Sequence, residues 1–426
     1  MTRIQPHQVT QTSADVVVVE MLRSNLEALV EEMLHLLVRS AYSTLMRESR
    51  DCSFLVTDEH GRVVTSTAAN FVHATAYRPL VRSTLEKWGR DGLHEGDVII
   101  ANHPYLASVP HTPDLAVIVP AFLDGELVAF SCTIAHKPDF GGAVPGSNTS
   151  KSTELYQEGF LLPLTKLYDA GVYRQEIEDI LVVNVRHPDL VLGDTRAQIG
   201  TTRVGAERVT RLAQRYGLGP MRAAFDELLR LCDRRMRAAL ATWPDGTFAA
   251  EGYTDNDGVR LDIPVKFYVQ VTKQGETIHF DLSGSDDQTL GPVNMRPPWV
   301  EVCAYYTLLS MLDPDLRFND GVRESVRLTL REGSVVNPRI PGPVGAGIVS
   351  SYRLMDVMLD ALSHFAPERA VAQSGGSGGP TAITWEPASP GGRSLLQYEI
   401  FGTGLGGHSG GDGASGVVVH TANLTS

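Results

Sequence analysis

Cysteine is scarce in this chain, and its four cysteines show none of the spacings that would give them a joint role. They stand far apart among 426 residues, at positions 52, 132, 232 and 303. Zinc knuckles and disulfide frameworks both need patterned cysteine spacings, and none occurs here. We therefore expect free thiols in a reducing compartment, and the cytoplasm is the predicted location.

Long hydrophobic runs and an export signal are also missing. Nowhere do about 18 apolar residues follow one another without a charge, which is the length that a membrane-spanning helix needs. The N-terminus shows no basic segment followed by an apolar stretch and a small-residue cleavage site. The sequence therefore predicts neither a membrane-spanning protein nor one secreted by a visible signal.

Positive charge is in deficit, and a standard nucleotide-binding loop is absent. The chain has 37 Lys and Arg against 50 Asp and Glu, which gives a net charge of -13. Nucleic-acid phosphates are neutralised by a stripe of basic side chains, and no such stripe is visible, so nucleic-acid binding is not expected. The nucleotide-binding pattern G-x-x-x-x-G-K-[ST] does not occur either. If ATP takes part in the function, another polypeptide is expected to bind it.

What the chain does contain is an ordinary globular composition spread over a long sequence. Hydrophobic residues make up 42% and charged residues 20%, and 426 residues exceed what one core usually serves. We predict a mixed α and β (α+β) protein of at least two domains. The expected division is an N-terminal metal-site domain over 1–190, a helical segment over 191–245, and a β-rich, glycine-rich domain over 246–426. This last domain is expected to be incomplete at its C-terminus.

Hydrophobic periodicity predicts the main elements. Apolar residues at three- and four-residue intervals predict an amphipathic helix over 15–47, and β-branched runs around polar turns predict hairpins. One hairpin is expected over 54–66 and a second over 115–135. The other predicted elements are a strand over 97–101, helices over 175–185, 192–241 and 302–312, and strands within 247–282.

Three potential metal ligands surround the second hairpin. His111 and Asp114 precede its first strand, and His136 follows its second strand. Since an antiparallel hairpin returns the chain to the end where it began, these side chains are expected to converge. Imidazole and carboxylate ligands hold zinc, manganese or iron and leave positions open for water or substrate. The pattern predicts a divalent metal site, and with it an enzyme.

The same residue types also have structural explanations. A Pro-Asp pair before a strand is a common turn, and single histidines such as His35 and His364 are expected to be structural. Asp51, at the junction of the first helix and the first hairpin, is a weak candidate by spacing alone. The glycines at 375–379 and 402–416 fit flexible loops or anion-binding loops, because glycine lets backbone N–H groups approach an anion.

A series of short motifs runs in order along nearly the whole chain. They include Arg50-Asp51-Cys52-Ser53, Asn102-His103-Pro104-Tyr105, His111-Thr112-Pro113-Asp114, Ala135-His136-Lys137-Pro138-Asp139, Glu154-Leu155-Tyr156-Gln157-Glu158-Gly159, Gly193-Asp194-Thr195-Arg196, Asp281-Leu282-Ser283-Gly284, Gly291-Pro292-Val293-Asn294, Leu312-Asp313-Pro314-Asp315 and Tyr398-Glu399. Each motif is weak alone, but together they resemble the hydantoinase B/oxoprolinase family.

The resemblance implies the B component of an ATP-dependent hydrolase that opens a cyclic amide or imide. In such systems ATP is bound by an actin-like A component, which phosphorylates the substrate oxygen, and the activated intermediate passes to the B component. By resemblance, Asn294 would orient the substrate or its phosphate, and Glu399 would act as a base on the attacking water. The implied metal ligands are His111, Asp114 and His136, with Asp51.

Two other functions stay open, and two positions depart from the family pattern. The chain could be a subunit of an ATP-dependent ketone carboxylase, of the acetone or acetophenone type, or a non-catalytic scaffold. Many relatives carry Asp at the position of His103 and a second His at the position of Lys137. His103 is therefore a further potential ligand, whereas Lys137 is expected to place a cation near the metal. The substrate, the metal and the stoichiometry of the complex stay open.

Overall fold

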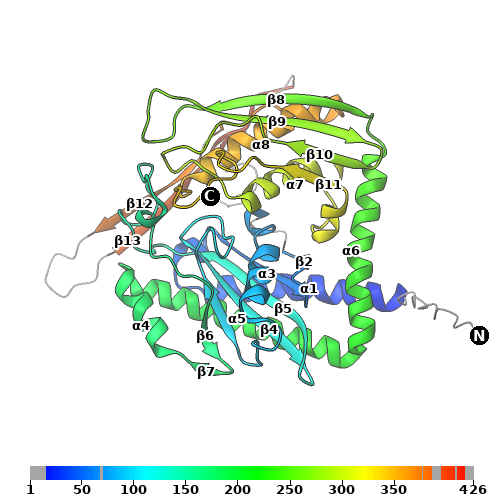
Figure 1. Ribbon diagram of the computed structural model, residues 1–426, viewed down its shortest axis with the longest axis vertical. Helices are drawn as coiled ribbons and strands as arrows, with labels where there is room; N and C mark the ends of the chain where they lie inside the picture. Colours follow the sequence, from blue (N-terminus) through cyan, green and yellow to red (C-terminus); the bar gives the residue numbers. More distant parts are fainter. Residues whose placement is uncertain (1–15, 68–70, 377, 386–394, 408–409, 418–426) are drawn as a thin grey trace, which may run out of the picture.

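The computed structural model describes residues 16–67, 71–376, 378–385, 395–407 and 410–417. Figure 1 shows two sheets, one in the lower and one in the upper half of the view, with long helices beside them. The predicted mixed α and β class is confirmed. No helix in the described part has the length and apolar character needed to cross a membrane.

The lower sheet has seven strands in the order β2-β1-β5-β4-β3-β6-β7, and every neighbouring pair is antiparallel. Both predicted hairpins are confirmed, as β1–β2 and β4–β5. The strand bounds are β1 (Cys52–Asp58), β2 (Val63–Ser66), β3 (Val98–Ala101), β4 (Asp114–Leu123), β5 (Glu126–His136), β6 (Thr165–Asp169) and β7 (Val172–Tyr173).

Both faces of this sheet are buried, so its central strands are apolar on both sides. On β4, Leu115 and Val117 enter a core formed with the long helices, whereas Ala116 and Ile118 enter the core shared with the upper half. Successive side chains of a strand point to opposite faces. The face of the sheet on which a side chain of β4 or β5 lies therefore follows from its place in this alternation.

Three long helices cover the first face: α1 (Val16–Ser40), α5 (Pro188–Tyr216) and α6 (Leu218–Leu240). The helix pair predicted over 192–241 is confirmed, and it is divided at Gly217, whose φ of 85° ends α5. Glycine adopts this backbone region at no steric cost.

The predicted helix over 15–47 extends too far. It ends at Ser40, and a short helix α2 (Thr44–Arg47) follows, capped by the Ser43 hydroxyl. The backbone N–H groups of Tyr42 and Ser43 donate to Asp194 on α5, at 2.7 and 3.0 Å. A carboxylate more than 150 residues away in the sequence thus takes the amides that a continuous helix would use.

The upper half contains a four-stranded sheet in the order β11-β10-β9-β8, with two apolar helices packed against it and against the lower sheet. The predicted strands within 247–282 are confirmed, and residues 265–271 alternate between buried and half-buried. The helix predicted over 302–312 begins earlier, at Pro297. The bounds are β8 (Gly246–Thr254), β9 (Val265–Gln274), β10 (Thr277–Asp281), β11 (Val326–Thr329), α7 (Pro297–Leu312) and α8 (Gly347–Ser363).

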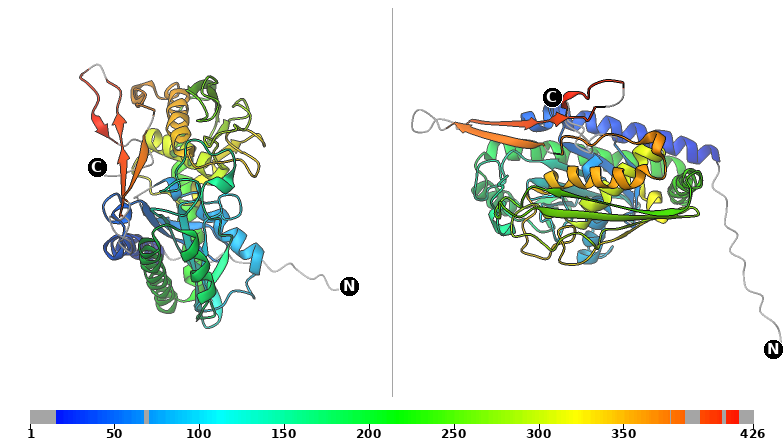
Figure 2. Two further views of the ribbon diagram at one scale, coloured as in Figure 1. Left: turned by 90° about the vertical axis from the view of Figure 1, so that its left-hand side faces the viewer. Right: turned by 90° about the horizontal axis from the view of Figure 1, so that it is seen from above.

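One cluster of buried hydrophobic side chains joins the second face of the lower sheet to α7, α8 and the upper sheet. The domain boundaries at 190 and 245 stay a prediction. A long hairpin, β12 (Gly379–Trp385) and β13 (Leu395–Phe401), runs along the outside of the molecule, as both views in Figure 2 show. The remaining elements are α3 (Tyr77–Trp88), α4 (Gln175–Asn184), β14 (Thr403–Gly404), β15 (Ser415–Val417) and the short 3-10 helices η1 (Phe71–His73), η2 (Leu155–Gln157), η3 (Asp320–Glu324) and η4 (Pro367–Arg369).

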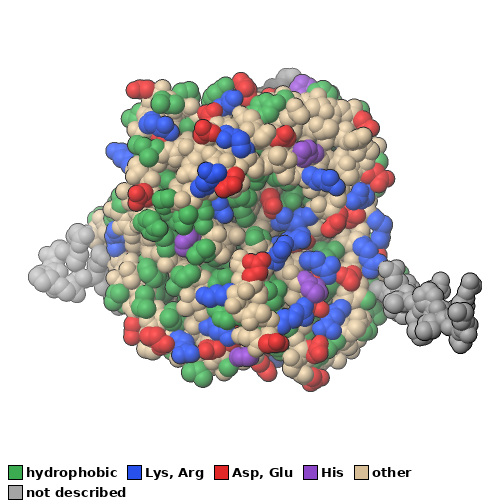
Figure 3. All heavy atoms as spheres, in the orientation of Figure 1, with side chains coloured by type: hydrophobic (Ala, Val, Ile, Leu, Met, Phe, Trp, Pro, Cys, Tyr) green, Lys and Arg blue, Asp and Glu red, His purple; other side chains and the backbone are tan. Residues whose placement is uncertain are grey.

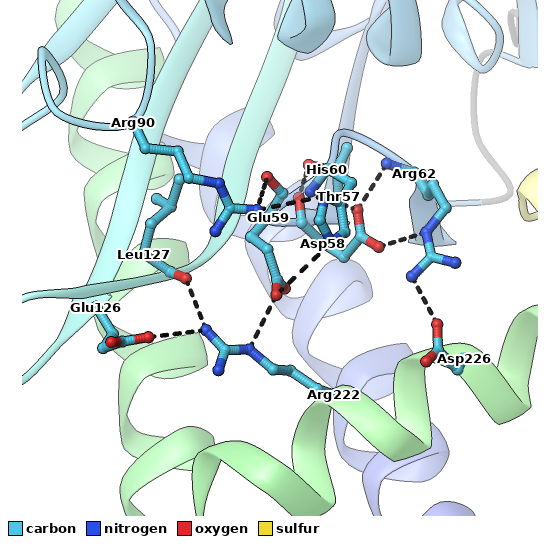
Figure 4. A network of polar contacts seen from close by, with 10 residues as sticks. All are labelled: Thr57, Asp58, Glu59, His60, Arg62, Arg90, Glu126, Leu127, Arg222 and Asp226. Carbon is cyan, nitrogen blue, oxygen red and sulfur yellow. Dashed lines mark hydrogen bonds and ion pairs between the residues drawn. The ribbon is translucent and has the colours of Figure 1, made fainter. Parts of the chain in front are cut away.

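The turns of both hairpins are tied to α6 by a network of ion pairs, shown in Figure 4. Arg222 on α6 contacts Glu59 of the β1–β2 turn at 2.9 Å and Glu126 of β5 at 3.1 Å. Arg62 pairs with Asp226 of α6 at 2.7 Å. In Figure 3 basic and acidic side chains gather together beside α6, whereas hydrophobic side chains gather on the left of the view. The network fixes the turn end of the sheet, opposite the end that carries the potential ligands.

Candidate metal centre

The register of the β4–β5 hairpin places two potential ligands side by side. Asp114 pairs directly with His136 across the two strands. Both are the terminal residues of their strands, rather than flanking residues as the sequence predicted. The His111 carbonyl accepts the Asp114 amide at 3.1 Å, so a tight turn brings His111 back to the same point. Local topology alone therefore assembles these three residues.

The ligand atoms lie at distances that suit a shared ion. His111 Nε2 is 3.1 Å from His136 Nδ1 and 3.3 Å from Asp114 Oδ2, and His136 Nδ1 is 3.5 Å from Asp114 Oδ1. Two atoms about 2.05 Å from a tetrahedral ion lie about 3.3 Å apart. Among the described residues, these three form a group whose ligand atoms all lie within 4.8 Å of one another.

Asp51 stands at the edge of this group. It directly precedes β1, and its carbonyl accepts the backbone N–H of His136 at 3.0 Å. Its Oδ2 is 3.7 Å from His136 Nδ1. The structure therefore brings Asp51 beside the other three predicted ligands, in reach of an ion that they would hold.

Burial and charge prepare the group for a cation. Burial raises the pKa of Asp114, but His111 and His73 outweigh that effect and hold this pKa well below its usual value. Burial lowers the pKa of His111, but Asp114, with smaller contributions from Asp51 and Glu158, raises it above its ordinary value. Asp114 Oδ1 is buried and accepts no hydrogen bond. An ionised, unsatisfied carboxylate oxygen beside two imidazoles fits a divalent metal.

His73 is a functional candidate that the sequence did not reveal. It ends η1 and is 1% exposed, with Nε2 3.6 Å from Asp114 Oδ2. Its Nδ1 hydrogen-bonds the Ser53 hydroxyl at 3.0 Å, and that hydroxyl contacts Tyr77 Oη at 2.6 Å. A lone histidine in an irregular segment carries no spacing signal, and the contact with Asp114 spans 41 positions. The fold alone brings it to the site.

A cavity of about 300 Å³ opens beside the four predicted ligands. Trp299 of α7 packs against His111, with ring centroids 5.8 Å apart. Tyr398 of β13 packs against His136, with centroids 5.6 Å apart, and its hydroxyl lies 3.3 Å from His136 Nε2. Further side chains in the wall are Val72, His73, Asn148, Ile348, Val349, Tyr352 and Ile400. The volume suits a small organic molecule.

A sequence model of the hydantoinase B/oxoprolinase family matches residues 15–426. The chain belongs to this family. It is 32% identical over 378 residues to a Pseudomonas sp. (strain NS671) protein provisionally named as the B component of a D-/L-hydantoinase, and the match covers 85% of the chain. It is 29% identical over 370 residues to the beta chain of the Pseudomonas jessenii caprolactamase, with 86% of the chain covered. The chain spans 63% of the length of each of these relatives.

The fold agrees with this membership. The crystal structure of the ATP-dependent caprolactamase from Pseudomonas jessenii superposes with a TM-score of 0.86 at 26% identity, covering 97% of this chain and 72% of that chain. A nucleotide-free acetone carboxylase structure gives a TM-score of 0.85 at 18% identity, covering 96% and 56%. The second likeness concerns the fold alone. The names of both curated relatives designate one subunit of a larger assembly.

Within this hydantoinase B fold, Glu399 does not face the cavity. It lies on β13 between Tyr398 and Ile400, both of which line the cavity. Strand alternation therefore turns Glu399 to the opposite face, where it is exposed and accepts a hydrogen bond from Gln397 at 2.5 Å. Its expected role as a base has no support in this arrangement, and its neighbour Tyr398 takes the place at the site.

Asn294 is also apart from the ligands. Its side chain is fully buried, and its Nδ2 donates to the carbonyls of Thr289, Gly291 and Pro343 at 3.0 to 3.2 Å. Its Oδ1 accepts the Thr289 amide at 2.8 Å. Since this amide group is occupied by backbone partners and does not line the cavity, we assign Asn294 to holding two loops together.

The two departures from the family pattern do not add charge or ligands to the cavity. In the alternation of side chains along β5, Lys137 falls with the residues that face the helices, and its ammonium donates to Gln198 of α5. Burial lowers its pKa to about 8. His103 accepts the Tyr105 amide at 3.2 Å and lies outside the cavity wall. His103 is thus not part of the ligand group, whereas Asp114 acts on the pKa of Lys137 through their charges, so that a cation near the metal stays a prediction.

A buried carboxylate supports the cavity from behind. Glu158 Oε1 accepts hydrogen bonds from the Ser152 hydroxyl at 2.8 Å and the Gly345 amide at 2.7 Å, and Oε2 accepts the Val344 amide at 3.0 Å. Burial raises the pKa of Glu158 to about 7, although these hydrogen bonds act in the opposite direction. Because Gly345 lines the cavity, Glu158 holds one wall in place. The sequence indicated no such role for it.

Proposed function

We propose that this chain is the metal-bearing B component of an ATP-dependent hydrolase that opens a cyclic amide or imide. The observation that carries the proposal is the buried group of His111, Asp114 and His136 at the floor of a small cavity. Family membership supports the reaction class, since relatives bear the names hydantoinase and caprolactamase. The proposed reaction is attack on a ring that a partner A-type, actin-like ATPase has activated by phosphorylation.

A divalent zinc, manganese or iron ion would be held by His111, Asp114 and His136, with Asp51 as a fourth ligand. When bound, such an ion supplies Lewis-acid stabilisation of negative charge on a substrate oxygen. The Tyr398 hydroxyl, 3.3 Å from His136 Nε2, orients that imidazole from the side opposite Asp51. Partners of this kind fix the ring orientation of a ligating histidine.

The walls of the cavity hold the ring and limit access of water. Trp299 and Tyr352 supply flat, buried surfaces. Asn148 supplies an amide that also donates to the Tyr398 hydroxyl at 2.5 Å. His73 stands beside Asp114 at the edge of the cavity. Nucleotide binding is assigned to the partner, because this chain carries no phosphate-binding loop pattern.

Metal analysis of purified variants tests the proposal. We expect about one divalent ion per chain in the wild type, and loss of that ion in His111→Ala and His136→Ala. His35→Ala is the matched control, because His35 is exposed on α1, and it should keep its metal. Cyclic-amide hydrolysis with the partner ATPase and ATP should disappear in the first two variants alone. A wild-type chain without stoichiometric metal would instead support the scaffold alternative.

A ketone carboxylase subunit is the second candidate, since one relative bears the name acetophenone carboxylase. The two reactions differ in the co-reactant, because carboxylation consumes bicarbonate and hydrolysis consumes water. An assay of the complex with ATP and a ketone should therefore show no bicarbonate-dependent product. Replacing Glu399 does not discriminate between these reactions, since β13 directs its side chain away from the cavity.

A further inference from the structure

The charge of the cavity wall is unbalanced in a way that bears on the substrate. Asp51 and Asp114 are the acidic residues of the wall, and three histidines accompany them. None of the described residues that line the cavity is Lys or Arg. A divalent ion would be shared by the two carboxylates and the phosphoryl group of the activated ring, so that no cationic side chain of the wall is left for a further anionic substituent.

Of the cationic side chains close in sequence to the wall, Arg50 and Lys151 are exposed and outside it, and two others are engaged elsewhere. Lys137 follows His136 but donates to Gln198 of α5, on the other face of the sheet. Arg296 precedes α7 and stacks on Tyr105, 4.1 Å from the ring centroid, while donating to the Pro338 carbonyl. Neither lines the cavity.

Two backbone donors in the loop before the nearest helix are already taken. Helix α8 begins at Gly347 beside the cavity, and Val344 and Gly345 belong to the loop that leads into it. Successive backbone amides of a loop can bind an anion. Here both donate to the Glu158 carboxylate, at 3.0 and 2.7 Å. The protein's own carboxylate therefore occupies the place that a substrate anion would need.

Asn148, Thr149, Ser150, Tyr352 and Tyr398 add polar but uncharged groups to the wall, and its apolar part comes from four separate parts of the chain. Val72 follows the start of η1, Trp299 lies on α7, Ile348 and Val349 form the first turn of α8, and Ile400 lies on β13. These side chains can gain contact area only with an uncharged group. An ionised carboxylate among them would lose its hydration without a partner, which is costly.

We infer that the substrate is an uncharged ring with an alkyl or aryl substituent, and that a ring bearing a carboxylate is rejected. This inference rests on the proposed function and specifies the substrate class of the same site. The substituent lies against Ile348, Val349 and Ile400, while the ring amide faces Asp114 and the two metal-binding histidines. Selectivity then comes from the absence of a cationic partner rather than from a steric block.

A matched pair of ligands tests the inference on the metal-loaded chain. The pair is a five-membered lactam with a methyl substituent and the same lactam with a carboxylate in its place. We expect the neutral lactam to bind at least ~100-fold more tightly in ligand-observed NMR competition, since an unpaired buried charge costs several kcal/mol. Hydrolysis by the full complex with ATP should show the same preference in kcat/KM. Equal or tighter binding of the carboxylate would overturn the inference.

Two lysine variants and one control variant locate the cause of the preference. Val349→Lys adds a cation to the wall and should narrow the preference at least tenfold, and Ile348→Lys repeats the change one residue away. Lys151→Ala removes an exposed cation of the adjoining hollow and should leave the preference unchanged. If Lys151→Ala selectively weakens the carboxylate ligand, the anion has a site and the inference is wrong. Binding of the neutral lactam without hydrolysis would count against the proposed function, not against this selectivity.

Discussion

Replacing Glu158 by glutamine should change how the stability of the protein depends on pH. Burial raises the pKa of Glu158 from 4.5 to about 7. Between these two values the folded protein holds a proton that the unfolded chain has released. Stability therefore falls as pH rises through this window, because the folded state increasingly has to deprotonate a buried group. Glutamine carries no titrating proton, so Glu158→Gln should lack this loss.

The size of the effect follows from the shift of about 2.5 pKa units. At 1.36 kcal/mol per unit, the wild type loses about 3 kcal/mol relative to Glu158→Gln between pH 4.5 and pH 7.5. Glu158→Gln also loses stability, because in the wild type the Val344 amide donates to Glu158 Oε2. In the variant the N–H₂ group of the glutamine would face this amide, and two donors would meet. An unsatisfied buried donor costs about 1–3 kcal/mol, but this cost does not vary with pH.

Urea unfolding of both proteins at pH 5, 6, 7 and 8 would measure the change. The difference in unfolding free energy between wild type and Glu158→Gln should change by about 2–3 kcal/mol across the series, and the wild type should become relatively less stable as pH rises. Glu95→Gln, at an exposed position, is the control and should track the wild type. Parallel curves for wild type and Glu158→Gln would show that this carboxylate does not titrate between pH 5 and 8, and the reasoning from burial would fail.

Three further predictions concern the supports of the site. Gly205→Ala should destabilise the protein by about 1–3 kcal/mol, because a Cβ there would lie 2.4 Å from the Phe54 ring. Gly200→Ala, on the same helix, adds a Cβ that meets no atom within 4 Å and should stabilise the protein by about 0.5–1 kcal/mol. Thermal or urea unfolding measures both changes. Burial lowers the pKa of Lys137 to about 8, so between pH 8 and 10 the folded protein has lost a proton that the unfolded chain keeps. The unfolding free energy of the wild type should therefore rise by about 1.4 kcal/mol per pH unit relative to that of Lys137→Met. Parallel pH dependences of the two proteins would contradict this. Tyr398→Phe removes a hydroxyl 3.3 Å from His136 Nε2 and should weaken metal affinity at least ~10-fold in chelator competition, while unchanged affinity would remove Tyr398 from the site.

The ligand group could be predicted from the sequence because its assembly is local. His111, Asp114 and His136 fall within one hairpin, whose two apolar strands and polar turn are visible as a pattern. The register of such a hairpin follows from its turn and from the alternation of buried side chains. Only the ends were misplaced, since Asp114 and His136 belong to the strands themselves.

Features that depend on distant contacts escaped the sequence. The break after Ser40 arises because Asp194 of α5 binds the amides of Tyr42 and Ser43. His73 reaches Asp114 only through the packing of η1 against the sheet. Periodicity reports which face of an element is buried, but it does not report which element will lie against that face.

Glu399 shows how one residue of register decides a functional assignment. The motif Tyr398-Glu399 presents two chemically plausible groups, and a carboxylate is the more usual base. On a strand only one of the two can face the cavity, and the pairing of β13 with β12 selects Tyr398. The glycine-rich sequence of this region predicts loops rather than a strand. The alternation of a strand could therefore not be used to decide which of the two side chains faces the cavity.

The site therefore divides into a local part and a composite part. The ligands come from one hairpin and the adjacent start of β1, so their geometry depends on strand pairing that remote substitutions barely alter. The apolar wall comes from η1, α7, α8 and β13, which share no hydrogen-bond ladder with that hairpin. Side chains of the wall can consequently change without displacing the ligands. Substitutions at Ile348 or Val349 should alter which ring binds while leaving metal content unchanged, and a variant that altered both would show that the two parts are mechanically coupled.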